Sequence, residues 1–207
     1  MADTVWLARH GQRQDTLDPN WAKTAPRPFD SPMADEGHVQ ARKLGRRLKQ
    51  EGIGHIFASP FLRTVETAHH VAEALDLPVK VEAGMSEWLQ GKWFPERPPM
   101  LQMPELKERF PRLDPAYRSI VLPEHPEDSA KLFDRCGRTI EHMIRTYDEP
   151  ILMIGHGASV VTISAVLLSM NNTDDFTCPL CSLFKLVRTG SKWTLELCAD
   201  ESHLKEV

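Results

Sequence analysis

Residues 4–13 of this 207-residue chain read Thr-Val-Trp-Leu-Ala-Arg-His-Gly-Gln-Arg. The apolar run Val5–Ala8, bounded by polar residues, is typical of a strand buried on both faces of a sheet. Polar residues begin abruptly at Arg9 and His10, where the strand ends, and open α/β sheets bind ligands at the carboxyl ends of their strands. Two arginines around a histidine, with Gly11 allowing a ligand to approach the backbone, predict a site for a phosphoryl group.

A second stretch repeats this arrangement late in the chain. The apolar run Ile151–Ile154 leads directly into Gly155-His156-Gly157, so a second strand delivers a histidine at its tip. Residues 158–170 are apolar nearly all round, which is typical of a helix buried against a sheet. The two strand tips together favour a functional site over an ordinary solvated loop.

The composition is that of an ordinary globular protein, with 41% hydrophobic and 26% charged residues. We interpret residues 1–207 as a single domain with a substantial core. The net charge of −4 argues against a nucleic-acid or membrane surface. A strand that begins almost at once leaves no room for a secretory signal, and four cysteines are too few for a disulfide scaffold, so we expect a cytoplasmic location.

Cys178-Pro179-Leu180-Cys181 has metal or redox spacing but is better explained as small residues entering a strand.

Between the two histidine stretches, helix and strand patterns alternate. Helical spacing of apolar residues predicts a helix over residues 37–50, and residues 53–58 read as a second parallel strand. Ser59-Pro60 predicts an N-cap and a proline at the first helical position of the next helix. Arg63 lies near the start of that helix, where the helix dipole opposes a cation, and a bound phosphate would account for its position.

Two segments without sustained periodicity are predicted to shape a pocket. Residues 14–36 form a long loop that provides one wall, with Trp21 or Phe29 available for substrate contact. Residues 83–126, rich in proline and tryptophan, predict an irregular cap insertion with one helix around residues 104–110.

The remaining patterns complete the expected architecture. A short strand is predicted over residues 79–82 and a helix over residues 127–147. Residues 183–188 and 193–198 alternate like a hairpin at the edge of a sheet. The expected fold is a three-layer α/β/α sandwich whose sheet is mostly parallel with an antiparallel edge strand.

Three motifs, in this order, resemble the histidine phosphatase superfamily in its phosphoglycerate mutase-like branch. They are Arg9-His10-Gly11, the segment Ser-Pro-Phe-Leu-Arg-Thr-Val-Glu-Thr-Ala at 59–68, and Gly155-His156-Gly157. Residues 9–15, with Gly84-Met85-Ser86-Glu87-Trp88, are most similar to the phosphatase domains of suppressor-of-T-cell-receptor-signalling proteins and ecdysteroid-phosphate phosphatases. Phosphoglycerate mutases usually carry a small residue at Arg13. A threonine common in the family stands here as Ala34, so Asp35 is expected to cap that helix instead.

The resemblance and the chemistry of arginine imply the same phosphate-binding groups, namely Arg9, Arg13, Arg63 and His156. A guanidinium fork binds two phosphate oxygens at once and keeps its charge, and His156 would add a hydrogen-bond donor. His10 is the expected nucleophile, because a neutral imidazole nitrogen can attack phosphorus and form a phosphohistidine.

Glu87 is the expected proton donor to the leaving group, at the acid position of the family. A carboxyl against an aromatic ring can stay protonated through desolvation, and the same group can later activate water. Glu82, Glu96 and Asp15 remain alternatives for this role. His156 completes the expected catalytic set with His10 and Glu87.

The favoured function is hydrolysis of phosphate monoesters, with a preference for aromatic phosphoesters such as phosphotyrosine as substrates. The expected partner is therefore a phosphorylated small molecule or a phosphopeptide, a homodimer is expected, and no cofactor or metal is expected. A phosphoglycerate mutase and a non-catalytic module that binds phosphorylated ligands are the alternatives. The other histidines, including His38, His55, His69, His70 and His142, are interpreted as surface or packing residues.

Overall fold

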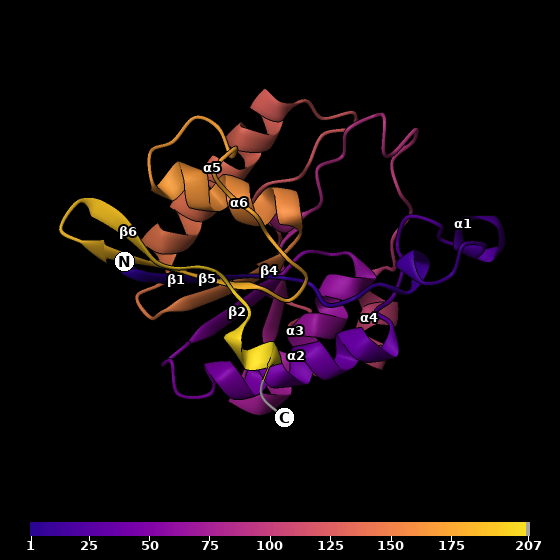
Figure 1. Ribbon diagram of the computed structural model, residues 1–207, viewed down its shortest axis with the longest axis horizontal. Coiled ribbons are helices and arrows are strands. Elements are labelled where there is room, and N and C mark those ends of the chain that lie inside the picture. Colours follow the sequence, from indigo (N-terminus) through magenta and orange to yellow (C-terminus); the bar gives the residue numbers. More distant parts are fainter. Residues whose placement is uncertain (206–207) are drawn as a thin grey trace.

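The computed structural model describes residues 1–205 as a six-stranded sheet with the strand order β3-β2-β4-β1-β5-β6 (Figure 1). The first four strands in the chain run parallel: β1 (Thr4–Arg9), β2 (His55–Ala58), β3 (Val79–Val81) and β4 (Ile151–Gly155). The hairpin of β5 (Leu183–Thr189) and β6 (Lys192–Asp200) pairs antiparallel along the edge beside β1. The predicted mostly parallel sheet with an antiparallel edge is confirmed.

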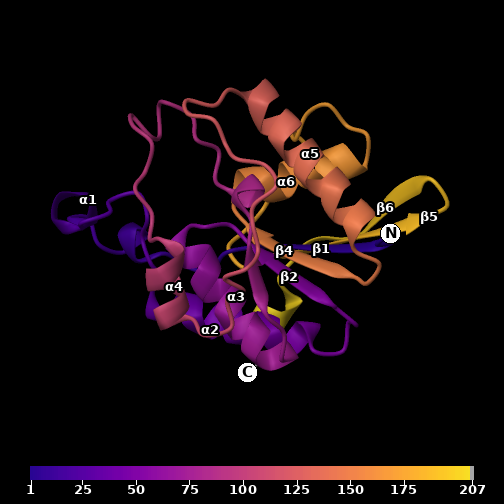
Figure 2. The ribbon, with the colours of Figure 1, turned by 180° about the vertical axis from the view of Figure 1, so that it is seen from behind.

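Helices cover both faces of this sheet and make the predicted three layers. In Figures 1 and 2, α2 (Asp35–Leu48) and α3 (Leu62–Leu75) lie on one face, and α5 (Ser129–Thr146) and α6 (Gly157–Leu167) lie on the other. The proline-rich segment contributes α4 (Met103–Arg109), which lies beside α2 and α3. Short turns complete the chain: η1 (Gln14–Thr16), α1 (Trp21–Thr24), η2 (Ala83–Met85) and η3 (Ser202–Leu204). Within residues 1–205, no helix has the length and apolar character needed to cross a bilayer.

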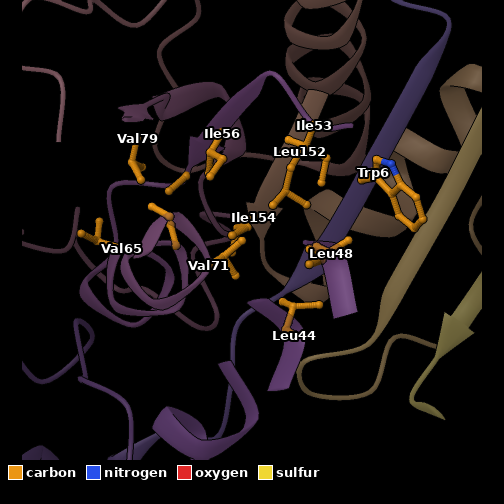
Figure 3. Close-up of a cluster of buried hydrophobic side chains, with 14 of the residues drawn as sticks. Trp6, Leu44, Leu48, Ile53, Ile56, Val65, Val71, Val79, Leu152 and Ile154 are labelled. Carbon is orange, nitrogen blue, oxygen red and sulfur yellow. The ribbon is translucent and has the colours of Figure 1, made fainter. Parts of the chain in front are cut away.

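Strand β1 supplies both cores because its side chains alternate across the sheet. Trp6 and Ala8 belong to the cluster under α2 and α3, part of which is shown in Figure 3. Val5 and Leu7 belong to the cluster under α5 and α6. All four are buried, as the continuous apolar run predicts for a central strand covered on both faces.

The strand register brings the ends of the parallel strands to one edge of the sheet. Arg9 pairs with Gly155, and the backbone N–H of His10 then donates to the carbonyl of Gly155 at 3.0 Å. The backbone N–H of Ser59, just after β2, donates to the carbonyl of Ile154 at 3.0 Å. The residues that follow β1, β2 and β4 therefore meet directly.

Two predicted helix starts are wrong. α3 begins at Leu62, not at Pro60, and Phe61 is its N-cap residue. The backbone N–H of Leu62 instead donates to Asp30 Oδ1 at 2.7 Å, so a carboxylate from the loop before α2 caps α3. α2 begins at Asp35, whose side chain is in the first turn and does not cap the helix, because the N-cap residue is Ala34.

Gly11 was predicted to let a ligand approach the backbone. In the structure its lack of a side chain instead permits close packing against α2. A Cβ atom built on Gly11 would lie 2.7 Å from the carbonyl oxygen of Gly37 in α2. A Cβ atom on Gly37 would in turn lie 2.3 Å from the carbonyl oxygen of Gln12. The two glycines therefore let the start of α2 press against the backbone that leaves β1.

Candidate active site

His10 follows β1 directly, and only one of its two ring nitrogens has a hydrogen-bond partner among the described residues. Its Nδ1 atom lies 2.8 Å from the carbonyl oxygen of Gly11, and a carbonyl can only accept, so Nδ1 carries the proton. Among the described residues Nε2 has no hydrogen-bond partner. Burial, and then the charge of Arg63, lower the pKa of His10 well below its ordinary value. His10 is therefore a neutral imidazole whose Nε2 lone pair is available.

His156, at the tip of β4, lies beside His10, with 5.3 Å between the ring centroids. Arg63 donates from its terminal nitrogen to Nδ1 of His156 at 3.1 Å, and Nε2 of His156 then donates to the Ser59 hydroxyl at 2.8 Å. Burial, and then the charge of Arg63, also lower the pKa of His156 well below its ordinary value. Both imidazoles are fully buried.

Three arginines converge on these rings. Arg63 is 1% exposed, and burial lowers its pKa to about 10, which leaves the guanidinium charged at neutral pH. Arg9 donates to the carbonyl oxygen of Cys178 at 2.5 Å. Arg13 lies 3.0 Å from a carboxylate oxygen of Asp15. All three guanidinium groups line one cavity, so the structure brings the predicted cation cluster together.

Glu87 also reaches this cavity, from the segment that follows β3 and η2. Its Oε2 atom lies 3.5 Å from Nδ1 of His156 and 3.8 Å from a terminal nitrogen of Arg63. Its Oε1 atom accepts from the backbone N–H of Trp88, while the indole N–H of Trp88 donates to the carbonyl of Glu127.

The alternative carboxylates differ in position. Glu82 is fully buried and accepts hydrogen bonds from Tyr117 and from the backbone N–H groups of Gly84 and Ile120. Glu96 is exposed and does not line the cavity. Asp15 does line it, but its carboxylate pairs with Arg13. Of the four candidates, Glu87 is the carboxylate beside His156.

Apolar side chains also line this cavity. Pro28 and Phe29 come from the loop before α2, and Trp93 and Phe94 come from the proline-rich segment. The cavity measures about 360 Å³, within the range of small-molecule sites. Of the two predicted contact residues, Phe29 lines it, whereas Trp21 does not and donates from its indole to the carbonyl oxygen of Pro28.

Sequence reasoning missed several supporting groups. Ser59 accepts from His156 instead of capping α3, and its position just after β2 is the same signal that singled out His10. Thr67 accepts from the backbone N–H of Gly11 at 3.2 Å, and the carbonyl of Cys178 fixes Arg9. Neither carries a local sequence signal.

Several of the remaining histidines make contacts within the helices. Nδ1 of His38 in α2 lies 2.9 Å from Nε2 of His70 in α3, so one ring nitrogen donates to the other. His69 and His70 each approach the carboxylate of Glu73, at 3.6 Å and 3.4 Å. The contact between His38 and His70 joins α2 to α3, the contacts with Glu73 lie within α3, and none of these residues lines the cavity.

This constellation at the ends of parallel strands corresponds to a known family. The model of the histidine phosphatase superfamily (branch 1) matches residues 5–201. The chain belongs to this superfamily. The superfamily member is 30% identical to the transcription factor tau 55 kDa subunit of Saccharomyces cerevisiae, over 83% of this chain and 42% of that protein. It is also 30% identical to the human ubiquitin-associated and SH3 domain-containing protein A, over 68% of this chain and 23% of that protein. It therefore spans less than half the length of either relative.

Among solved structures, the fold of this superfamily member is similar to that of the ecdysone phosphate phosphatase from Bombix mori in complex with tungstate. The TM-score is 0.77 at 20% identity, and the alignment covers 96% of this chain and 94% of that one. The predicted phosphoglycerate mutase-like fold is confirmed.

Proposed function

We propose that this histidine phosphatase superfamily member hydrolyses phosphate monoesters through a phosphohistidine formed on His10. The observation that carries the proposal is the state of the His10 ring. Its Nδ1 proton is fixed by the Gly11 carbonyl, while Nε2 lacks a partner among the described residues and lies among three guanidinium groups. This is the arrangement that a nitrogen nucleophile for an anionic phosphorus centre requires.

The reaction proceeds in two displacements. The Nε2 lone pair of His10 attacks phosphorus, the bond from phosphorus to the ester oxygen breaks, and protonated Glu87 donates its proton to the leaving oxygen. A water molecule then attacks the phosphohistidine, and the Glu87 carboxylate takes up its proton. The bond between nitrogen and phosphorus breaks, and phosphate and neutral His10 are released.

Arg9, Arg13 and Arg63 hold the phosphoryl oxygens in both steps and offset the charge that spreads over them in the transition state.

The negative charge of a bound phosphate dianion stabilises the protonated, imidazolium form of His156. His156 can then donate from Nδ1 to a phosphate oxygen, the role expected from the sequence.

The apolar wall supports a preference for aromatic phosphoesters, including phosphotyrosine. Phe29, Trp93 and Phe94 line the same cavity as the three arginines, so an aromatic leaving group could contact them while the arginines bind the phosphate. The name of the Bombix mori protein, an ecdysone phosphate phosphatase, is consistent with a bulky apolar leaving group. A phosphorylated small molecule or phosphopeptide substrate, a homodimer and a cytoplasmic location stay predictions.

The test compares wild type with His10→Ala on para-nitrophenyl phosphate, with exposed His142→Ala as the matched control. We expect His10→Ala to abolish turnover and the acid-labile, alkali-stable phosphoprotein trapped by rapid quenching, and His142→Ala to retain both. Full turnover by His10→Ala would reject the nucleophile. Isomerisation of 3-phosphoglycerate without release of phosphate would indicate a mutase, and phosphopeptide binding without turnover would indicate a binding module.

A further inference from the structure

The segment that carries Glu87 is held by Arg135, a buried arginine of α5. After η2 this segment has no regular secondary structure, so its own hydrogen bonds do not fix it. Arg135 of α5, only 3% exposed, donates from one terminal nitrogen to the carbonyl oxygens of Gly84 and Ser86, at 2.8 Å and 3.1 Å. Its other terminal nitrogen donates to the carbonyl oxygen of Glu87 at 3.3 Å.

Glu127, which lies just before α5, fixes Arg135 in turn. Its two carboxylate oxygens accept from Nε and from a terminal nitrogen of Arg135, both at 2.7 Å. The backbone of Glu127 also holds the stretch that follows Glu87. Its N–H donates to the carbonyl of Leu89, and its carbonyl accepts from the indole of Trp88, both at 2.9 Å.

These bonds define the conformation of Glu87 itself. The carbonyl of Ser86 belongs to the peptide plane before Glu87, and the carbonyl of Glu87 belongs to the plane after it. Because Arg135 binds both, the two backbone dihedral angles of Glu87 are fixed, and with them the direction of its Cα–Cβ bond. The hydrogen bond from the Trp88 N–H to Oε1 then aims Oε2 toward His156 and Arg63.

Arg135 uses all five of its N–H donors within this network, and none of them points into the cavity. A buried ion pair costs desolvation energy and is often no more stabilising than apolar residues of similar volume. What the pair provides is the planar fork of a guanidinium, which can hold several carbonyl groups in one fixed geometry.

We propose that Arg135, held by Glu127, is a positioning residue that places the Glu87 carboxyl for proton transfer to the leaving group. This inference rests on the proposed function, in which Glu87 is the acid and base. Arg135→Lys keeps the charge but loses the fork, so the Glu87 segment can shift. Misplacement of a catalytic group by an ångström costs on the order of 10²-fold in rate.

The experiment measures kcat and KM for para-nitrophenyl phosphate, phenyl phosphate and an alkyl phosphate, whose leaving groups need a proton to increasing degrees. For Arg135→Lys we expect about a tenfold larger fall in kcat on the alkyl phosphate than on para-nitrophenyl phosphate, with KM changed less than about twofold. Glu127→Gln should show the same pattern, which keeps the test open if one variant folds poorly. Arg138→Lys is the matched control, because Arg138 is on the same helix but exposed, and it should behave as wild type.

Two further results separate positioning from a merely structural role. In a Glu87→Gln background, Arg135→Lys should add no further dependence on the leaving group, since its effect passes through Glu87. An equal fall on all three substrates, no fall at all, or additive effects in the double variant would overturn the proposal. If Glu87→Gln itself were indifferent to the leaving group, the proposed function would lose its acid. If Glu87→Gln were selective and Arg135→Lys were not, the positioning role alone would fail.

Discussion

Replacing Glu66 of α3 by glutamine should change how the stability of the fold depends on pH. One oxygen of the half-buried Glu66 carboxyl accepts from the backbone N–H of Met33 at 2.6 Å and so ties the loop before α2 to α3. Burial raises the pKa of Glu66 to about 7, against an ordinary value of 4.5, although the hydrogen bond opposes the shift. Asp30, whose pKa burial also raises, adds repulsion to the Glu66 carboxylate.

The sign follows from proton binding. Between pH 4.5 and pH 7 the folded state keeps the Glu66 proton that the unfolded chain has lost, so stability falls as the pH rises through this window. A pKa difference of this size corresponds to about 3 kcal/mol, and partial exposure of the side chain reduces the expected effect to about 1–2 kcal/mol. Glu66→Gln keeps an oxygen that can accept from Met33 but cannot ionise. It should therefore match wild type near pH 5 and exceed its stability by about 1–2 kcal/mol at pH 8.

Urea denaturation followed by tryptophan fluorescence at intervals from pH 5 to pH 8 measures this difference. Glu36→Gln is the control, since Glu36 is an exposed glutamate in the first turn of α2. The free energy of unfolding of this control should change with pH in parallel with that of wild type from pH 5 to pH 8. If the stability curves of Glu66→Gln and wild type also ran parallel, the raised pKa and the burial that causes it would be refuted.

Two further substitutions test the packing of α2 and the apolar wall of the cavity. Gly37→Ala would place a methyl group 2.3 Å from a backbone oxygen, so we expect a loss of about 2–3 kcal/mol in urea unfolding, whereas Gly137→Ala in α5, with no atom closer than 3.9 Å, should gain up to about 1 kcal/mol. Equal effects of the two would contradict the close approach at Gly11. Trp93→Ala should raise KM for phenyl phosphate by about threefold to tenfold and leave inhibition by inorganic phosphate unchanged. The control Trp193→Ala, in β6, should change neither KM nor the inhibition by phosphate. Weaker inhibition by phosphate in Trp93→Ala would place this side chain at the phosphate site.

The parts of the fold that were predictable are those whose signal is local. β1 is buried on both faces of the sheet and is therefore apolar throughout. α2 and α5 each bury one face, so their apolar residues recur every three or four positions. The gathering of His10, His156 and Arg63 could also be expected, because parallel strands in one sheet end at the same edge. The structure does bring these three residues together.

The parts that were not predictable depend on hydrogen bonds between distant segments. Ser59-Pro60 has the local pattern of a helix start, yet Asp30 caps α3 from a position 32 residues earlier, and Ser59 is left to accept from His156. Once the loop supplies the cap, the helix can begin later and still satisfy its first N–H group. A local pattern therefore fails where a remote side chain offers the backbone a better partner.

The same reasoning explains why the orientation of Glu87 could not be read from its neighbours. The residue following it, Trp88, suggests an aromatic ring against the carboxyl, but the indole points to the carbonyl of Glu127. The backbone of Glu87 is instead fixed by Arg135, 48 residues further along the chain. Positions at strand ends follow from the sheet, which is a repeating structure, whereas the orientation of a side chain on an irregular segment follows from whichever buried charge holds its carbonyl groups.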